Sequence, residues 1–131
     1  MYLLDTNIWL EVLLGQEKSD EVIEFLKKVK NTEIYISSFS LYSICIYLSK
    51  IKNYDTANKF IKDLVKNDVN VIYVDIIELN KIIEIEKKFN LDFDDGLQYY
   101  ISKKYDLTLI SYDKHFDKTP KGRKTPKEIL L

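Results

Sequence analysis

Short apolar runs alternate along this chain with longer segments in which apolar residues recur every three to four positions. We expect buried strands at four of these runs: Tyr2–Leu4, Ile34–Ile36, Val71–Val74 and Leu107–Ile110. At least one helical segment separates each run from the next, so the strands cannot pair through tight hairpins and are expected to be parallel. The sequence therefore predicts an α/β fold, with a central parallel sheet of four to five strands and helices on both faces.

The segments between the strands carry the start and stop signals of helices. A helix over Ile8–Leu14 is expected to end at Gly15, because glycine readily adopts the left-handed conformation found at helix ends. Further helices are expected to begin near Ser19, Ser37 or Ser38, Asn53, Asp75 and Asp92. The segment Glu128–Leu131 is expected to add an edge strand, which would be the fifth. No repeat or linker interrupts the chain, so residues 1–131 are interpreted as one domain.

The composition excludes several classes of protein. Hydrophobic residues make up 46% of the chain and charged residues 31%, which is typical of a folded globular protein. The formal net charge is -1, so attraction to a polyanion requires a local basic patch. Cys45 is the one cysteine; it is expected to pack in the core, and an internal disulfide is excluded. Without a signal-peptide pattern or a membrane-spanning run, we expect a cytoplasmic protein that makes no membrane contact.

Acidic residues follow or precede two of the predicted strands. Asp5 comes directly after the first strand and Asp113 after the fourth, while Asp94 and Asp95 open the helix before that fourth strand. The carboxyl ends of parallel strands meet at one edge of a sheet, so these acids are expected to converge there. Clustered carboxylates repel each other and call for a divalent cation. Oxygen ligands without histidine favour Mg²⁺ or Mn²⁺ over zinc.

Each of these acids also has a structural interpretation. Asp94 and Asp95 would complement the dipole of the helix that they open. Asp113 would serve as an ordinary turn residue. Asp5 is harder to explain in this way, because a carboxylate at the end of a buried strand is costly without a partner. The residue pattern alone leaves a shared metal site and separate structural roles open.

Three motifs shift this balance toward the metal site. Leu4–Ile8 reads LDTNI, Asp92–Gln98 reads DFDDGLQ and Thr108–Phe116 reads TLISYDKHF. In this order and spacing they resemble the acidic motifs of PIN-domain nucleases, including the toxins of VapBC-type toxin–antitoxin pairs. The family's third acid is usually followed by a small residue, so Asp95 rather than Asp94 is aligned with it. The resemblance extends from the first strand to about Phe116.

The resemblance implies a PIN-like fold and a Mg²⁺- or Mn²⁺-dependent endoribonuclease that leaves 5′-phosphate and 3′-hydroxyl ends. It implies that the catalytic, metal-holding residues are Asp5, Asp95 and Asp113. Five residues would lie beside these ligands: Thr6, Asn7, Ser43, Asp94 and Ser111. It further implies an RNA substrate, an antitoxin protein as partner and a homodimer. In the structural alternative, Thr6 and Asn7 instead cap the first helix.

One further position, on the helix after the second strand, departs from the family pattern. Ile36–Ser43 reads ISSFSLYS, and the family's usual glutamate falls on Ser43. A neutral hydroxyl supplies no charge, so weak metal binding and low activity are expected. An alternative interpretation is therefore a catalytically weak or inactive PIN domain that acts by binding a protein. A receiver- or phosphatase-type phosphoryl-transfer domain fits less well, because those families need an acidic pair where this chain has Asp5 alone.

The side chains that could bind a nucleic acid are less specific indicators of function than the acidic motifs. Five basic residues in the tail could contact phosphates or form a solvated segment: Lys118, Lys121, Arg123, Lys124 and Lys127. Tyrosines near the motifs would stack on bases or pack in the core: Tyr99, Tyr100, Tyr105 and Tyr112. His115, the one histidine, is expected to be a loop residue without a catalytic role.

Overall fold

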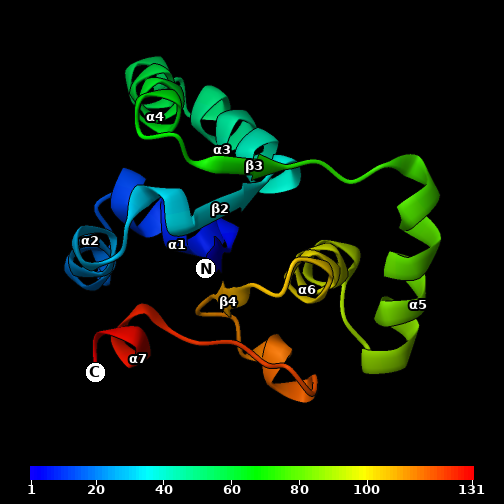
Figure 1. Ribbon diagram of the computed structural model, residues 1–131. Helices are drawn as coiled ribbons and strands as arrows, with labels where there is room; N and C mark the ends of the chain where they lie inside the picture. The colour runs from blue at the N-terminus through cyan, green and yellow to red at the C-terminus, as the bar shows by residue number, and fades with distance from the viewer.

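The computed structural model describes residues 1–131 and contains one four-stranded sheet (Figure 1). The strands are β1 (Tyr2–Leu4), β2 (Ile34–Ser37), β3 (Asn70–Ile72) and β4 (Thr108–Ile110). Their order across the sheet is β3-β2-β1-β4, and every pairing is parallel. The predicted α/β fold with a parallel sheet is therefore confirmed, although β3 ends two residues before the predicted boundary.

The chain also forms seven α-helices and three short 3₁₀ helices; the last helix of each kind follows the last strand, and the others lie between strands. The α-helices are α1 (Thr6–Leu13), α2 (Ser19–Lys28), α3 (Ser38–Lys50), α4 (Tyr54–Lys66), α5 (Leu79–Phe89), α6 (Phe93–Lys104) and α7 (Pro126–Leu130). The 3₁₀ helices are η1 (Asn31–Glu33), η2 (Ile76–Glu78) and η3 (Lys114–Lys118). None of the helices combines the length and the apolar character needed to span a membrane.

The two faces of the sheet are covered by different helices (Figure 1). Successive strand residues point to opposite faces, so Leu3 and Leu4 enter different cores. Leu4 and Ile110 pack with buried residues of α1 to α4. Leu3 and Leu109 pack with buried residues of α5, α6 and η3. Helices on both faces bury most of the short strands, which explains why these strands read as mainly apolar runs.

The C-terminal segment does not form the predicted fifth strand. Residues Pro126–Leu130 instead form α7, which packs against α2. Thr125 caps this helix in a reciprocal capping box with Glu128, and Pro126 occupies the first turn, where its missing N–H is not needed. The sheet edge beside β4 is extended only by a single parallel bridge between Ile110 and Lys124.

The chain changes direction across the sheet at β1. It runs outward from β1 through β2 to β3, and then returns to place β4 on the other side of β1. Binding sites in open parallel sheets form at such a switch point, outside the carboxyl ends of the strands. The backbone N–H of Asp5 donates to the carbonyl oxygen of Ile110 at 2.9 Å, which holds the two strand ends side by side. The acidic residues that follow β1 and β4 therefore begin from neighbouring positions.

Candidate metal centre

Asp5 is held at the end of β1 by four hydrogen-bond donors. Its Oδ1 accepts from the Thr6 backbone N–H at 2.8 Å and from Gln98 Nε2 at 3.0 Å. Its Oδ2 accepts from Ser111 Oγ at 2.7 Å and from Asn7 Nδ2 at 3.3 Å. Asp5 is also the N-cap of α1, so the alternative in which Thr6 and Asn7 cap this helix is wrong. Thr6 through its backbone N–H and Asn7 through its side-chain amide donate to the Asp5 carboxylate.

Burial nevertheless raises the pKa of Asp5 above its ordinary value of 3.8, and the charge of Asp113 adds to this effect. The donors favour the ionised carboxylate and oppose the rise in pKa, but the loss of water around the carboxylate is the larger effect. Asp5 is therefore a fixed carboxylate whose negative charge is not fully compensated by the protein. A nearby cation would stabilise its ionised form.

Gln98 and Ser40 form a buried polar network beneath Asp5 that the sequence analysis missed. Gln98 Nε2 donates to Ser40 Oγ at 2.7 Å as well as to Asp5. Ser40 Oγ also lies 2.8 Å from Thr6 Oγ1 and accepts from Ser37 Oγ at 3.2 Å. The network joins α1, α3 and α6 at the point where these helices carry the candidate site. The one available signal was a glutamine three residues after Asp95, on the inward face of α6.

Asp95 lies in the first turn of α6 and is buried, whereas its neighbour Asp94 is exposed. Burial raises the pKa of Asp95 to about 6, and the charges of Asp113, Asp94 and Asp5 contribute to this rise. Gly96 follows Asp95 at the contact between α6 and α5, where a Cβ atom would lie 3.4 Å from the carbonyl oxygen of Ile82. This close contact explains the small residue after the acid and is consistent with the alignment of Asp95.

Asp113 follows β4 and caps η3. Its Oδ1 accepts from the His115 backbone N–H at 2.9 Å, and its own backbone N–H donates to Ser111 Oγ at 2.9 Å. Ser111 is fully buried and donates its hydroxyl to Asp5, so one serine positions two of the three predicted acids. A short turn thus aligns the carboxylates that follow β1 and β4.

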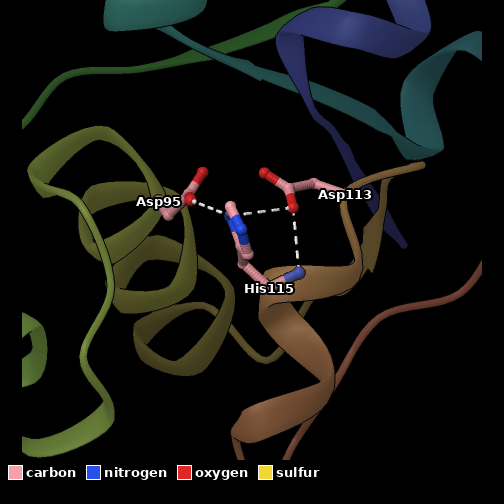
Figure 2. Close-up of side chains that lie close together, drawn as sticks. All are labelled: Asp95, Asp113 and His115. Carbon is pink, nitrogen blue, oxygen red and sulfur yellow. Dashed lines mark hydrogen bonds and ion pairs between the residues drawn. The ribbon is translucent and has the colours of Figure 1, made fainter.

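His115 is not the uninvolved loop residue that the sequence predicts. It lies in η3, and its Nδ1 is 3.1 Å from Asp113 Oδ1 and 3.5 Å from Asp95 Oδ2. Figure 2 shows the ring turned toward both carboxylates, with Asp95 on α6 and Asp113 at the start of η3. The imidazole of His115 therefore contacts both Asp95 and Asp113.

The predicted acids share one cleft of about 300 Å³ at the switch point of the sheet. Its lining residues are Asp5, Thr6, Asn7, Leu10, Phe39, Ser43, Asp94, Asp95 and Asp113. Ser43 reaches this cleft from α3, so the position that is usually a glutamate in the family faces the acids. Ser111 lies beneath the cleft, bonded to Asp5. The structure thus brings together every site residue that the sequence predicts.

The cleft has the chemistry of a divalent-cation site. Ligand atoms of Asp95, Asp113 and His115 lie within 4.8 Å of one another, and so do carboxylate oxygens of Asp92, Asp94 and Asp95. The mutual repulsion that raises the pKa of Asp95 would be relieved by a bound cation. Carboxylate oxygens are the ligands that Mg²⁺ and Mn²⁺ prefer in proteins. The residues present therefore fit such an ion.

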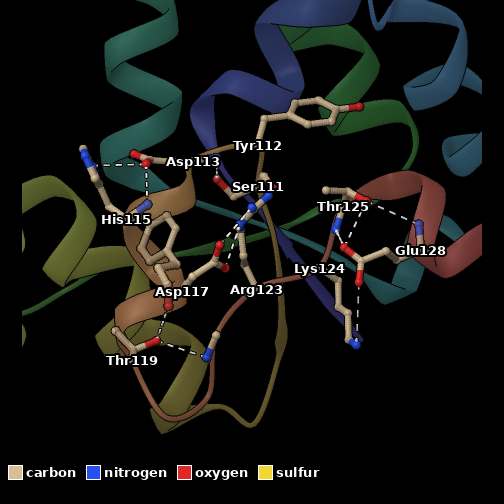
Figure 3. Close-up of polar contacts among 12 residues, drawn as sticks. Ser111, Tyr112, Asp113, His115, Asp117, Thr119, Arg123, Lys124, Thr125 and Glu128 are labelled. Atoms are coloured by element: carbon tan, nitrogen blue, oxygen red, sulfur yellow. Dashed lines mark hydrogen bonds and ion pairs between the residues drawn. The ribbon is translucent and has the colours of Figure 1, made fainter.

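The basic tail beside the cleft is partly committed to structure (Figure 3). Arg123 Nη1 donates to the backbone oxygen of Ser111 at 3.0 Å, and Arg123 Nε donates to Asp117 at 3.1 Å. Arg123 therefore fixes the loop after β4 and is neither a solvated residue nor a free phosphate contact. Tyr112 likewise donates its hydroxyl to Glu21. The exposed cations of this tail are lysines.

Cys45 differs from its prediction as well. It is half-buried rather than buried, and it lines an apolar pocket of about 330 Å³ between α3, α4 and the β3 region. Tyr99, in contrast, is buried and packs edge-on against Phe89, so it belongs to the core and cannot stack on a base.

A model of the PIN domain matches residues 2–122, and the chain belongs to this family. Solved structures with the same fold include a toxin–antitoxin complex from Klebsiella pneumoniae, with a TM-score of 0.79 and 20% identity over 96% of this chain and 98% of that chain. FitAcB from Neisseria gonorrhoeae gives a TM-score of 0.72 at 19% identity, covering 97% of this chain and 99% of that chain. The resemblance noted in the sequence is thereby confirmed.

A third similar structure is VapC20 from Mycobacterium tuberculosis, described as a sarcin-ricin loop cleaving toxin. Its TM-score is 0.74 at 14% identity, over 86% of this chain and 90% of that chain. No curated protein gives a sequence match to this chain. At these identities the solved structures establish the shared fold, and the site residues rest on the geometry described above.

Proposed function

We propose that this PIN domain is a metal-dependent endoribonuclease that acts as the toxin of a toxin–antitoxin pair. The observation that carries the proposal is the convergence of Asp5, Asp95 and Asp113 in one cleft. The three acids come from segments far apart in the sequence and meet at the switch point, where parallel α/β sheets bind ligands. Their burial and mutual repulsion favour a bound cation over an empty cluster.

In this proposal, Asp5, Asp95 and Asp113 hold Mg²⁺ or Mn²⁺. The ion lowers the pKa of a bound water and offsets the charge of the phosphate. Ser111 and Gln98 keep the Asp5 carboxylate in one orientation through hydrogen bonds of 2.7 and 3.0 Å. Thr6 and Asn7 donate to the same carboxylate and line the wall of the cleft. Asp94, exposed at the rim, adds negative charge that attracts the cation.

RNA is the proposed substrate, with hydrolysis leaving a 5′-phosphate and a 3′-hydroxyl. Support comes from VapC20, which shares the fold and is described as cleaving the sarcin-ricin loop. Lys114, which is exposed and directly follows Asp113 in the chain, is the proposed contact to the phosphate backbone, whereas Lys118 donates to the backbone oxygen of Asn90 at 3.0 Å. Such contacts do not depend on base identity, so they favour RNA binding without selecting a sequence.

An antitoxin protein is the proposed partner, and a homodimer is the proposed assembly. Support for the antitoxin comes from the K. pneumoniae complex, which is a toxin–antitoxin pair of the same fold. Support for protein contacts comes from exposed apolar residues that line one pocket over α3, α4 and the β3 region: Tyr42, Ile61, Val65 and Tyr73. A contiguous apolar surface of this kind marks a site of protein association. Light scattering on the purified chain measures the assembly directly.

The proposal is tested by incubating end-labelled RNA with the purified protein and Mg²⁺ or Mn²⁺. Cleavage should stop with a chelator and should be lost in Asp5→Asn. Asp55→Asn is the matched control, because it makes the same charge change at an exposed position in the first turn of α4. Circular dichroism should show the same fold for all three proteins. Equal cleavage by Asp5→Asn and the wild type would refute the proposed site.

A second candidate function is a PIN domain that has lost catalysis and acts by binding a protein. The observation that favours it is Ser43, which faces the cleft without supplying the charge of the usual glutamate. This candidate predicts that the antitoxin binds equally well to the wild type and to Asp5→Asn, and that neither protein cuts RNA. Measurable metal-dependent cleavage by the wild type would exclude it.

A further inference from the structure

The cleft differs in two ways from a site built only of carboxylates on the family pattern. It lacks one carboxylate, and it has an imidazole beside it. Ser43 replaces the usual glutamate on the α3 wall. His115 lies beside the cleft with Nδ1 close to two of the three acids. The chain contains a single histidine, so this is the only imidazole available anywhere in the protein.

The position of His115 is fixed by local structure. Asp113 caps η3 by accepting from the His115 backbone N–H, which keeps the histidine directly over the Asp113 carboxylate. Nδ1 then lies 3.1 Å from Asp113 Oδ1 and 3.5 Å from Asp95 Oδ2. Two neighbouring ligands of an octahedral ion with bonds of about 2.1 Å are about 3 Å apart. The spacing of Nδ1 from both carboxylates is therefore close to that of ligands on a shared ion.

The environment of the ring permits coordination. The His115 side chain is 60% exposed, so the ring can approach an ion without a change in packing. In the metal-free cleft Nδ1 faces two carboxylate acceptors, to which only an N–H can donate, and a cation bound between them would replace that proton. The Asp95 side chain is 11% exposed and the Asp113 side chain 28% exposed, so the carboxylates form the wall and the imidazole forms the outer edge. Figure 2 shows the three side chains converging from α6 and from η3.

We propose that His115 supplies a nitrogen ligand to the metal held by Asp95 and Asp113, and that the centre therefore prefers Mn²⁺ and other transition-metal ions to Mg²⁺. The inference rests on the proposed metal centre and adds the identity of the ion that it selects. Imidazole nitrogen binds transition metals well, whereas Mg²⁺ prefers oxygen. Because Ser43 stands in place of a carboxylate, the site has fewer of the charged oxygen ligands that hold Mg²⁺. The imidazole nitrogen of His115 adds a ligand that Mg²⁺ does not favour.

The single histidine allows a direct spectroscopic test. The full chain, freed of any histidine tag, is loaded with one equivalent of Mn²⁺ and examined by electron spin echo envelope modulation. The expected result is ¹⁴N modulation from a directly bound imidazole, converted to the ¹⁵N pattern when only histidine is ¹⁵N-labelled. The modulation should be absent in His115→Gln. Bound Mn²⁺ without imidazole modulation would overturn the inference and leave the proposed nuclease intact.

Calorimetry without RNA measures the metal preference separately from catalysis. The wild type should bind Mn²⁺ more tightly than Mg²⁺, and His115→Gln should weaken Mn²⁺ binding by about tenfold or more, as lost metal-site contacts do. Mg²⁺ binding should change by less than about threefold, because Mg²⁺ gains little from nitrogen. An equal loss for both ions would mean that His115 only orients the carboxylates, and would overturn the inference. Metal binding that also survives in Asp95→Asn would instead refute the proposed metal centre.

Discussion

Gln98 on α6 donates a hydrogen bond of 3.0 Å to Asp5 at the end of β1, although the two residues are 93 positions apart in the chain. Both side chains are buried, and the same Gln98 nitrogen also donates to Ser40 on α3. The other amide atom of Gln98, Oε1, is buried without a hydrogen-bond partner. The side-chain amide of Gln98 is thus oriented so that its nitrogen donates to Asp5, and this orientation leaves Oε1 without a hydrogen bond.

A glutamate at position 98 should destabilise the protein in a pH-dependent way. Gln98→Glu keeps the size of the side chain but places a second carboxyl group against Asp5. Near pH 4 a protonated carboxyl can still donate a hydrogen bond, whereas near pH 7 two buried charges repel each other. We expect the loss of unfolding free energy to grow as the pH rises from about 4 to about 7. Urea unfolding of the metal-free protein at several pH values measures this loss.

Gln98→Leu is the matched control for that experiment. It removes the donor to Asp5 and the unpaired Oε1 together without adding charge. Loss of a hydrogen bond to a charged group costs about 1.5–3 kcal/mol, and removal of the unpaired oxygen offsets part of this cost. The effect of leucine should depend much less on pH than the effect of glutamate. The same pH dependence in both variants would mean that Gln98 does not interact with the ionised Asp5.

Adding a carboxylate at position 43 should strengthen metal binding. Ser43 lines the acidic cleft from α3, and a helix tolerates glutamate at least as well as serine. Ser43→Glu adds a charged oxygen ligand, so Mg²⁺ binding should tighten more than Mn²⁺ binding and cleavage should become faster. Metal titration and RNA cleavage are measured on both proteins. Unchanged affinity for both ions would mean that residue 43 does not reach the ion.

The raised pKa of Asp95 predicts how the metal-free protein responds to pH. Its pKa is raised from 3.8 to about 6, so the folded state disfavours ionisation more than the unfolded state does. The unfolded chain therefore releases this proton first, and the free energy of unfolding should fall as the pH rises from 3.8 to about 6. Asp95→Asn should lack this contribution. The free energy of unfolding is measured for the wild type and Asp95→Asn across that pH range in the presence of a chelator, and the difference gives the contribution of Asp95. Saturating Mn²⁺ should restore the stability that the wild type loses above pH 6.

Glu78 should behave in the opposite sense, away from the cleft. Hydrogen bonds from Lys104, the Asp75 backbone N–H and Tyr100 lower the pKa of Glu78 from 4.5 to about 2. This group stabilises the fold above pH 4.5, and the stabilisation is lost as the pH falls toward 2. Glu78→Gln should therefore differ most from the wild type at neutral pH, with the difference shrinking in acid. A difference that stays constant from pH 6 to pH 2 would contradict the account.

Local sequence patterns predict the sheet and the positions of two of the three candidate acids. Strand runs buried on both faces are readable because most of their residues are apolar. Asp5 directly follows one such run and Asp113 lies three residues after another. Asp95 depends on tertiary structure, because two adjacent acids at a helix start look alike until α6 folds beside β4 and η3, where Asp95 is buried in the cleft and Asp94 stays exposed. Its choice over Asp94 came from family resemblance.

Other features of the site depend on tertiary packing, and the C-terminal helix depends on local capping signals. Gln98 reads as an ordinary polar helix residue, and only the docking of α6 beside α3 turns it toward Asp5. His115 reads as a loop residue, because its contact with Asp95 depends on how η3 meets α6. The mistaken C-terminal strand is different, since Thr125, Pro126 and Glu128 form a readable capping box and helix start. Local capping signals are therefore better guides there than a short apolar run.

The adjacent residues Asp94 and Asp95 offer the most direct measurement of the central claim, that buried carboxylates of this cleft hold the metal for RNA cleavage. Single-turnover cleavage of labelled RNA in Mn²⁺ is compared for the wild type, Asp95→Asn and Asp94→Asn. Asp95→Asn should be slower by about 100-fold or more, since even residues that only support metal ligands cost 10- to 100-fold when lost, and Asp94→Asn should stay within about tenfold of the wild type. Wild-type cleavage rates in Asp95→Asn, or cleavage that persists with excess chelator, would contradict the account.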